Sequence, residues 1–235
     1  MTNEQEQRYS RHLLLEDFGK DGQEKLLKSK VLIIGAGGLG SPCALYLAAA
    51  GVGTIGIADG DVVTLSNLQR QVIHTTADID RKKVDSAADK MRAMNPDITV
   101  VTYPDYINDE DIDALVDQYD FVIEATDNYA SRYRVNDACV RRNKPFCIGG
   151  VSHYSGQIMT HMPGSATYRD VFPEEPQQAT EGAQSPLPVL GPVVGMLGTI
   201  MATEAVKALA QTGEVLADRL LTFDAKTMQF NTFNL

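Results

Sequence analysis

Cysteine is scarce in this chain, with three residues, Cys43, Cys139 and Cys147, among 235. So few cysteines cannot form the disulfide framework of a small secreted protein. No cationic start followed by an apolar core is visible, so we expect no signal peptide. No uninterrupted apolar run is long enough to span a bilayer. Together these absences predict a cytoplasmic location.

Positive charge is also scarce. The sequence has 21 Lys and Arg against 31 Asp and Glu, which gives a formal net charge of −10. An acidic chain of this kind is a poor partner for nucleic acid or for an anionic membrane, so we expect neither. No internal repeat is evident, and the length is sufficient for one large domain with a sizeable core.

A glycine-rich stretch between residues 30 and 59 organises the rest of the sequence. It has the order strand, glycine loop, helix, strand and acid, and the glycines are Gly35, Gly37, Gly38 and Gly40. Glycines allow a tight turn and a close approach of backbone N–H groups to phosphate, and the next helix directs its positive end there. Asp59 ends the second strand about 20 residues later, where an acid can accept hydrogen bonds from a ribose. This order predicts an adenine-nucleotide site; the alternative is a turn that only packs helix on strand.

Polar and basic residues follow this stretch. Asn67 and Arg70 are three residues apart and would share the face of a helix, where an amide and a guanidinium suit an anionic ligand. Asp80 is predicted to cap a helix over residues 81–94, with Lys83 in its first turn. Because a cation there opposes the helix dipole, Lys83 is better tolerated if it faces an anion. The alternative is a solvated lysine.

A carboxylate and an amide, Asp127 and Asn128, come directly after a predicted buried strand at residues 121–125. Mg²⁺ prefers one or two carboxylates together with phosphate oxygens, so Asp127 is a candidate magnesium ligand. The alternative is that Asp127 caps the helix predicted over residues 128–142.

The N-terminal residues 1–28 have a helical pattern that is broken at Gly19. Arg8 and Arg11 are spaced to share one face of a helix. From spacing alone, a solvated basic patch is favoured over a functional role for these two arginines.

The remaining pattern alternates strands with helices. Residues 165–188 have no apolar period and are predicted to form a long mobile loop, and residues 191–210 form a helix with Pro192 in its first turn. Two closing strands are predicted at residues 219–223 and 228–233. The fold class is therefore α/β: a doubly wound, Rossmann-like, mostly parallel sheet with antiparallel C-terminal strands. We expect one domain over residues 1–235, with N-terminal helices at 1–29 and a mobile crossover-type loop at 163–190.

The ordered motifs resemble those of the ThiF/MoeB/HesA family. They are RYSRH, GAGGLG, the aspartate that ends the second strand, SNLQRQ, a lysine before valine, TDN and GPVVGMLGTIMATEAVK. Each motif alone is weak, but together in this order they are specific, and they extend from about Arg8 to Leu235. The family consists of ATP-dependent adenylyltransferases that activate ubiquitin-like sulfur-carrier proteins.

The resemblance implies a role for individual residues. The glycines would contact the ATP phosphates, Asp59 the ribose, and Lys83 the phosphates in the transition state. Asp127 would hold magnesium, and Arg11 would reach the ATP of a partner subunit, which implies a homodimer. The implied catalytic residues are Arg11, Arg70, Lys83 and Asp127, and the implied nucleotide-binding residues also include Asp61, Ser66, Asn67 and Asn128.

The sequence departs from the family pattern in its cysteines. Many members bind zinc through two Cys-x-x-Cys pairs, but the first pair is replaced here by Thr167-Tyr168-Arg169-Asp170 and the sequence ends at Leu235, before the second. We therefore expect no zinc. The loop cysteine of many members is also missing from the matching region, residues 181–188, so sulfur would come from a separate donor. The three cysteines that are present are expected to pack as small apolar residues.

The leading hypothesis is ATP-dependent adenylylation of the C-terminal glycine of a ubiquitin-like sulfur carrier ending in Gly-Gly, for thiamine or molybdopterin-type sulfur transfer. ATP and Mg²⁺ would be the cofactors. The altered loop leaves open a peptide or small-molecule carboxylate as the substrate. An NAD-dependent oxidoreductase is a third possibility that the glycine loop alone does not exclude.

Overall fold

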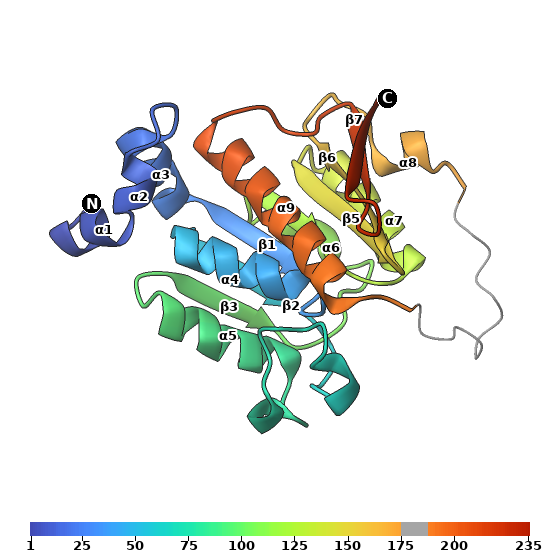
Figure 1. The fold of residues 1–235 in the computed structure, drawn as a ribbon, viewed down its shortest axis with the longest axis horizontal. Helices are drawn as coiled ribbons and strands as arrows, with labels where there is room; N and C mark the ends of the chain where they lie inside the picture. Colours follow the sequence, from blue (N-terminus) through green and yellow to red (C-terminus); the bar gives the residue numbers. More distant parts are fainter. Residues whose placement is uncertain (175–187) are drawn as a thin grey trace.

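A single eight-stranded sheet forms the centre of the computed structural model (Figure 1). The structure describes residues 1–174 and 188–235. The strands, in sequence order, are β1 (Lys30–Ile34), β2 (Thr54–Ala58), β3 (Thr99–Tyr103), β4 (Phe121–Glu124), β5 (Phe146–Ser152), β6 (Ser155–His161), β7 (Arg219–Asp224) and β8 (Gln229–Asn234).

The strand order is β3-β2-β1-β4-β5-β6-β7-β8. The first five strands in this order are parallel, and β6, β7 and β8 continue the sheet antiparallel. The order reverses between β1 and β4, and ligands in such sheets bind outside the carboxyl ends of the strands at this point. The predicted fold class, including the antiparallel C-terminal strands, is confirmed.

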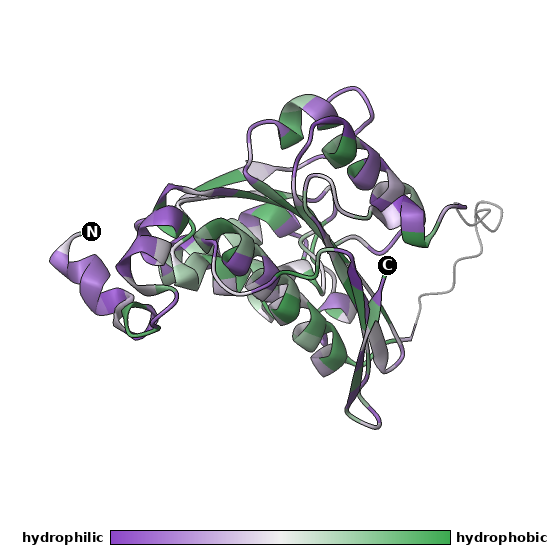
Figure 2. Ribbon diagram, turned by 90° about the horizontal axis from the view of Figure 1, so that it is seen from above, coloured by the Kyte–Doolittle hydropathy of each residue, from purple (hydrophilic) through white to green (hydrophobic). Residues whose placement is uncertain are grey.

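Helices cover both faces of the sheet, as the view from above shows (Figure 2). The helices are α1 (Asn3–Arg8), α2 (Ser10–Leu13), α3 (Gly19–Lys28), α4 (Gly40–Ala50), α5 (Lys83–Met94), α6 (Ile112–Val116), α7 (Tyr129–Arg141), α8 (Tyr168–Val171) and α9 (Gly191–Ala210). Alternate residues of β1 reach opposite layers: Val31 and Ile33 pack with the layer of α4, α5 and α9, and Leu32 and Ile34 with that of α6 and α7. This period-two alternation between two buried faces explains the continuous apolar run in β1.

Helix α9 lies across the sheet beside α4 (Figure 1). Its length and composition would suit a membrane span, but half of it is buried inside the molecule, as in the core helix of a folded domain. Glu204 and Lys207 interrupt its apolar sequence and form an ion pair.

The predicted capping of α5 by Asp80 is wrong. The helix begins at Lys83, and Asp80 has a φ of +69° outside it. The reason is local pairing of the chain with the segment after β2: Asp80 N donates to the Val63 carbonyl at 2.9 Å, and Val63 N donates to the Arg81 carbonyl at 2.9 Å. These backbone bonds fix Asp80 in a turn before the helix can start.

The loop predicted at residues 165–188 is partly helical. Thr167 caps the short helix α8, with its hydroxyl accepting from Asp170 N. Tyr168 is buried in the core, which the polar character of the segment concealed. Residues 175–187 of the predicted loop lie outside the described residues, and they include all but the last residue of the region 181–188 that lacks the family's cysteine.

Candidate active site

A cleft of about 670 Å³ opens at the carboxyl ends of β1, β2 and β4. A volume of this size suits a nucleotide-sized ligand. Nine of the predicted site residues line it: Gly35, Gly37, Gly38, Asp59, Asp61, Arg70, Lys83, Asp127 and Asn128. The sequence motifs therefore converge on one place, although they are spread over almost a hundred residues.

The glycine loop turns sharply at the end of β1. Gly35 has a φ of +105°, and a Cβ there would lie 2.6 Å from the Ala125 carbonyl oxygen. A Cβ at Gly40 would lie 1.8 Å from the Gly35 carbonyl oxygen, so this position also requires glycine. Gly40 packs the start of α4 against the loop and does not line the cleft.

Asp59 and the glycine loop are joined directly. One carboxylate oxygen of Asp59 accepts from Ala36 N at 2.8 Å and the other from Asp61 N at 2.9 Å. The acid at the end of β2 is thus fixed against the phosphate loop of β1, in the position where an acid contacts a ribose in this type of sheet.

His74 contacts the backbone of the same loop through Ala36, and the sequence analysis did not identify it. It is buried, its Nε2 lies 3.0 Å from the Ala36 carbonyl oxygen, and its Nδ1 lies 2.8 Å from Ser86 Oγ. Because a carbonyl only accepts, Nε2 donates, and the neutral ring satisfies both contacts. Burial lowers the pKa of His74 below its ordinary value, which keeps the ring neutral.

Lys83 faces an anion, as its place at the start of α5 predicts. Its side chain is 7 % exposed, and Nζ lies 2.6 Å from an Asp61 oxygen and 3.9 Å from an Asp59 oxygen. Burial raises the pKa of Asp61, but hydrogen bonds from Lys83 and Tyr106 outweigh it and lower the pKa. Tyr106 donates to the other Asp61 oxygen, and that hydrogen bond raises the pKa of the phenol to about 12. Sequence reasoning missed Tyr106, which lies in the segment after β3.

Asp127 has an exposed carboxylate at the cleft, and within residues 1–174 and 188–235 it forms no hydrogen bond or ion pair. Its suggested alternative role as a helix cap is wrong, because Asn128 caps α7 by accepting from Ser131 N at 2.8 Å. In the described part of the chain, no group of three or more His, Cys, Asp or Glu is placed to hold a metal ion. A single free carboxylate still fits Mg²⁺, which takes its other ligands from phosphate and water.

Arg70 is the guanidinium of this part of the cleft. Its Nη1 donates to the Ser66 carbonyl at 3.1 Å, which holds the side chain over the loop. The side chains of Ser66 and Asn67 do not line the cleft. Asn67 instead accepts from Thr64 N at 3.0 Å and closes a short 3₁₀ helix, Leu65–Asn67.

Arg11 lies far from this cleft. It is exposed on α2 and forms no hydrogen bond or ion pair with the described residues. The prediction that Arg8 and Arg11 share a helix face is wrong, because α1 ends at Arg8 and the chain turns at Tyr9. The turn exists because Tyr9 is buried, where its hydroxyl accepts from Asn95 Nδ2 at 2.9 Å.

The three cysteines are buried and unpaired, as predicted. Burial raises the pKa of the thiols of Cys43, Cys139 and Cys147, so none of them is an accessible thiolate. The absence of zinc stays a prediction.

Sequence reasoning missed two further residues: Arg132, which lines the cleft, and Glu124, which is buried beside it. Arg132 lines the cleft from α7, and its Nε lies 3.9 Å from an oxygen of Glu124, the last residue of β4. Glu124 is fully buried, and burial raises its pKa to about 7. No local pattern in the sequence marks Arg132, which lies inside α7.

The chain belongs to the ThiF family, whose model matches residues 9–235. Three curated relatives illustrate the similarity. They are the probable adenylyltransferase/sulfurtransferase MoeZ of Mycobacterium tuberculosis (44 % identical, covering 100 % of this chain and 61 % of MoeZ), the adenylyltransferase and sulfurtransferase MOCS3-1 of Zea mays (47 %, 97 % and 49 %) and the SAMP-activating enzyme E1 of Haloferax volcanii (42 %, 96 % and 83 %). The chain thus spans about half to two thirds of the length of MoeZ and MOCS3-1.

Solved structures share the fold. PaaA aligns with a TM-score of 0.87 and 24 % identity over 100 % of this chain and 74 % of PaaA. Escherichia coli MccB in a structure with ATP aligns with a TM-score of 0.85 and 24 % identity over 100 % of this chain and 72 % of MccB. At this level of identity the alignments show the fold alone.

Proposed function

We propose that this chain is an adenylyltransferase that uses ATP and Mg²⁺ to activate the C-terminal glycine of a ubiquitin-like sulfur-carrier protein. The observation that carries the proposal is the convergence of Arg70, Lys83 and Asp127 beside the glycine loop. Two cations and a free carboxylate beside a glycine loop suit a triphosphate with magnesium better than they suit a dinucleotide. Membership of the ThiF family and the names of its relatives support the same activity.

The reaction needs positioning and charge neutralisation rather than a covalent nucleophile. An oxygen of the carrier's C-terminal carboxylate attacks the α-phosphorus of ATP, the bond to the pyrophosphate oxygen breaks, and an acyl-adenylate remains. Arg70 and Lys83 would offset the negative charge of the phosphates. Asp127 would hold the magnesium ion, which screens that charge further when it is bound.

The three cysteines bear on the source of the sulfur that would be transferred to the activated carrier. Since Cys43, Cys139 and Cys147 are enclosed in the core, no described thiol can attack the acyl-adenylate. The proposal therefore includes a separate sulfur donor. The sulfur would be used for thiamine or molybdopterin-type products.

The test is release of pyrophosphate in the presence of a carrier, ATP and Mg²⁺, with Asp127→Ala as the variant. We expect the variant to lose at least about a hundredfold in rate, as is typical when a group that stabilises the charge of a transition state is removed. Unchanged pyrophosphate release by Asp127→Ala would show that the site is wrongly assigned. Release that is driven by a peptide or a small carboxylate, and by no carrier, would replace the carrier with that substrate class.

A further inference from the structure

Arg132 and Glu124 form an incompletely satisfied polar pair at the end of the cleft. One oxygen of Glu124 accepts from Thr126 N at 3.0 Å and from the Thr126 hydroxyl. Its other oxygen, together with Arg132 Nε, has no hydrogen-bond partner in the described residues, although both atoms are buried. The two atoms lie 3.9 Å apart, which allows charge attraction but is too long for a hydrogen bond.

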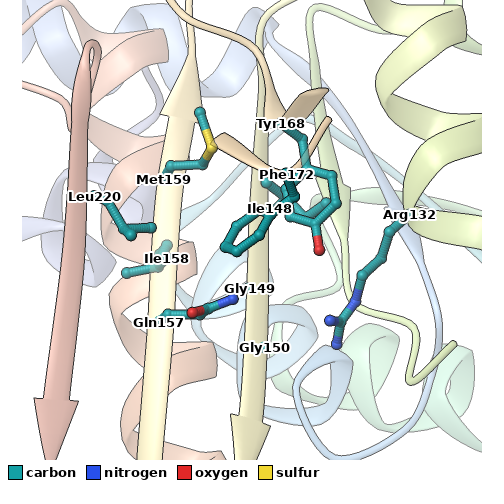
Figure 3. Close-up of a pocket in the computed structure, with 10 residues that line it drawn as sticks. All are labelled: Arg132, Ile148, Gly149, Gly150, Gln157, Ile158, Met159, Tyr168, Phe172 and Leu220. Atoms are coloured by element: carbon teal, nitrogen blue, oxygen red, sulfur yellow. The ribbon is translucent and has the colours of Figure 1, made fainter. Parts of the chain in front are cut away.

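The geometry leaves the outer nitrogens of Arg132 turned toward β5. A Cβ placed on Gly150 would lie 3.2 Å from Nη1 and 3.4 Å from Nη2, so the guanidinium lies directly over this glycine. The Tyr129 ring lies 5.5 Å from the guanidinium carbon. Figure 3 shows Arg132, Tyr168 and the Gln157 amide pointing toward the same stretch of β5. Gly150 adds no side chain there, so the guanidinium can lie against the strand.

Arg132 lines two cavities. It lines the large cleft and a second cavity of about 10 Å³ that it shares with Gly149, Gly150 and Gln157. The second cavity has room for a single water molecule. Of these two cavities, only the large cleft has room for a ligand at Arg132.

The strand order indicates which part of the reaction would take place beside Arg132. Asp59 lies at the end of β2, the glycine loop at the end of β1, Asp127 just beyond the end of β4, and Arg132 over β5. These strands are neighbours in that order, about 4.8 Å apart. A nucleotide with its ribose at Asp59 and its phosphates at the loop directs its α-phosphate toward β4. The attacking carboxylate then arrives from the side of β5.

We propose that Arg132 binds the C-terminal tail of the acyl substrate, carboxylate or adjacent carbonyl, and that Glu124 positions its guanidinium. A guanidinium presents two parallel N–H donors that match a carboxylate, which a lysine cannot reproduce. Glu124 acts through Arg132 and touches no substrate. This inference rests on the proposed adenylylation, because it assigns the second substrate of that reaction.

The test measures Arg132→Ala, Arg132→Lys and Glu124→Gln with whichever carrier supports ATP–pyrophosphate exchange by the wild-type chain. Binding of a non-hydrolysable ATP analogue and the melting temperature are measured on the same samples. Arg141→Ala is the matched control, since Arg141 lies on the same helix but pairs with Asp113 at the surface.

We expect Arg132→Ala to raise the KM for the carrier by about ten- to a hundredfold, the range for loss of a hydrogen bond to a charged group. The dissociation constant of the ATP analogue should change less than about twofold. Arg132→Lys should recover only part of the loss, Glu124→Gln should raise the carrier KM to a smaller extent than Arg132→Ala, and Arg141→Ala should match the wild type.

Two results would contradict the assignment, and they are distinguishable from failure of the activity itself. An unchanged carrier KM in Arg132→Ala would overturn it while adenylylation stands. A loss of ATP-analogue binding equal to the loss of carrier affinity would place Arg132 at the nucleotide instead. If the wild-type chain exchanges with no carrier, the proposed function fails, and this inference fails with it.

Discussion

Lys83 is a buried cation that the protein neutralises with its own carboxylates. Its Nζ lies 2.6 Å from Asp61 and 3.9 Å from Asp59. A buried charge without a partner is costly, so the ion pair with Asp61 stabilises Lys83 in its buried position. A bound phosphate would compete with Asp61 for the same ammonium group. The structure pairs Lys83 with Asp61, and the predicted contact of Lys83 with a bound phosphate stays a prediction.

His74 links the glycine loop to the pH dependence of stability. Its pKa is lowered below 6.5 in the folded chain, so below that pH the unfolded chain binds the proton more readily. The free energy of unfolding should therefore fall as the pH drops from 6.5 toward the lowered pKa. The slope contributed by one such group is at most about 1.4 kcal/mol per pH unit.

The measurement is urea denaturation of the wild type and of His74→Gln at a series of pH values. The variant should be less stable at neutral pH, because it disturbs the contacts to Ala36 and Ser86. Its stability should also depend less on pH below 6.5 than that of the wild type. Parallel pH profiles would show that His74 does not titrate as its burial implies.

Some site residues carry a sequence signal and others do not. The glycines, Asp59, Lys83 and Asp127 are predictable because each occupies a defined position at a strand or helix end. Tyr106 lies in the segment after β3 and Arg132 inside α7, and only the packing of the sheet brings them to the cleft. No local pattern distinguishes such residues from ordinary surface side chains.

At the scale of elements, α9 contains two glycines that differ in their need for a small residue. Gly198 lies against the start of α4, whereas Gly195 faces open space. A Cβ at Gly198 would lie 2.4 Å from the Leu39 carbonyl oxygen and 2.4 Å from Pro42, whereas a Cβ at Gly195 meets nothing within 4 Å. Gly198→Ala should therefore destabilise the protein by about 2 kcal/mol, through overpacking. Gly195→Ala should stabilise it by up to about 1 kcal/mol, because alanine favours the helix.

The free energy of unfolding of each variant is measured by denaturant unfolding and compared with the wild type. Each variant serves as the control for the other. Equal effects of the two substitutions would mean that α9 does not lie against α4 as the structure has it.

The predicted elements differ from the observed ones mainly where tertiary contacts decide. Helix α9 begins and ends where its pattern predicts, at Gly191 and Ala210. By contrast, the N-terminal helix is divided at Tyr9 because that side chain packs against Gly51, and α5 starts late because residues 80–82 pair with the segment after β2. Propensity and periodicity describe the chain locally, and both of these deviations come from contacts with distant residues.

At the scale of the whole molecule, α2 lies at the opposite end of the sheet from the carboxyl end of β1 (Figure 1), where the residues that line the cleft are found. Arg11 therefore cannot reach the cleft of its own chain, and the implied contact with ATP requires a second copy. In the proposed homodimer, each site would combine one chain's Asp127 with the other chain's Arg11. This arrangement is a proposal that mixing of inactive variants can test.

Mixing Arg11→Ala with Asp127→Ala chains should restore activity that neither has alone. Random exchange makes half of the dimers mixed, and each mixed dimer has one complete site, so recovery should reach about a quarter of the wild-type activity. The control is each variant mixed with itself. If subunit exchange is shown to occur and no activity returns, the site is not shared between subunits.

The most direct measurement is carrier-dependent ATP–pyrophosphate exchange with Mg²⁺, across a panel of small ubiquitin-like proteins that end in Gly-Gly. Adenylylation predicts that one carrier supports exchange and that trimming its last glycine abolishes it. ATP binding with no exchange for any carrier, or exchange that persists after the glycine is removed, would contradict adenylylation of a carrier's C-terminal glycine.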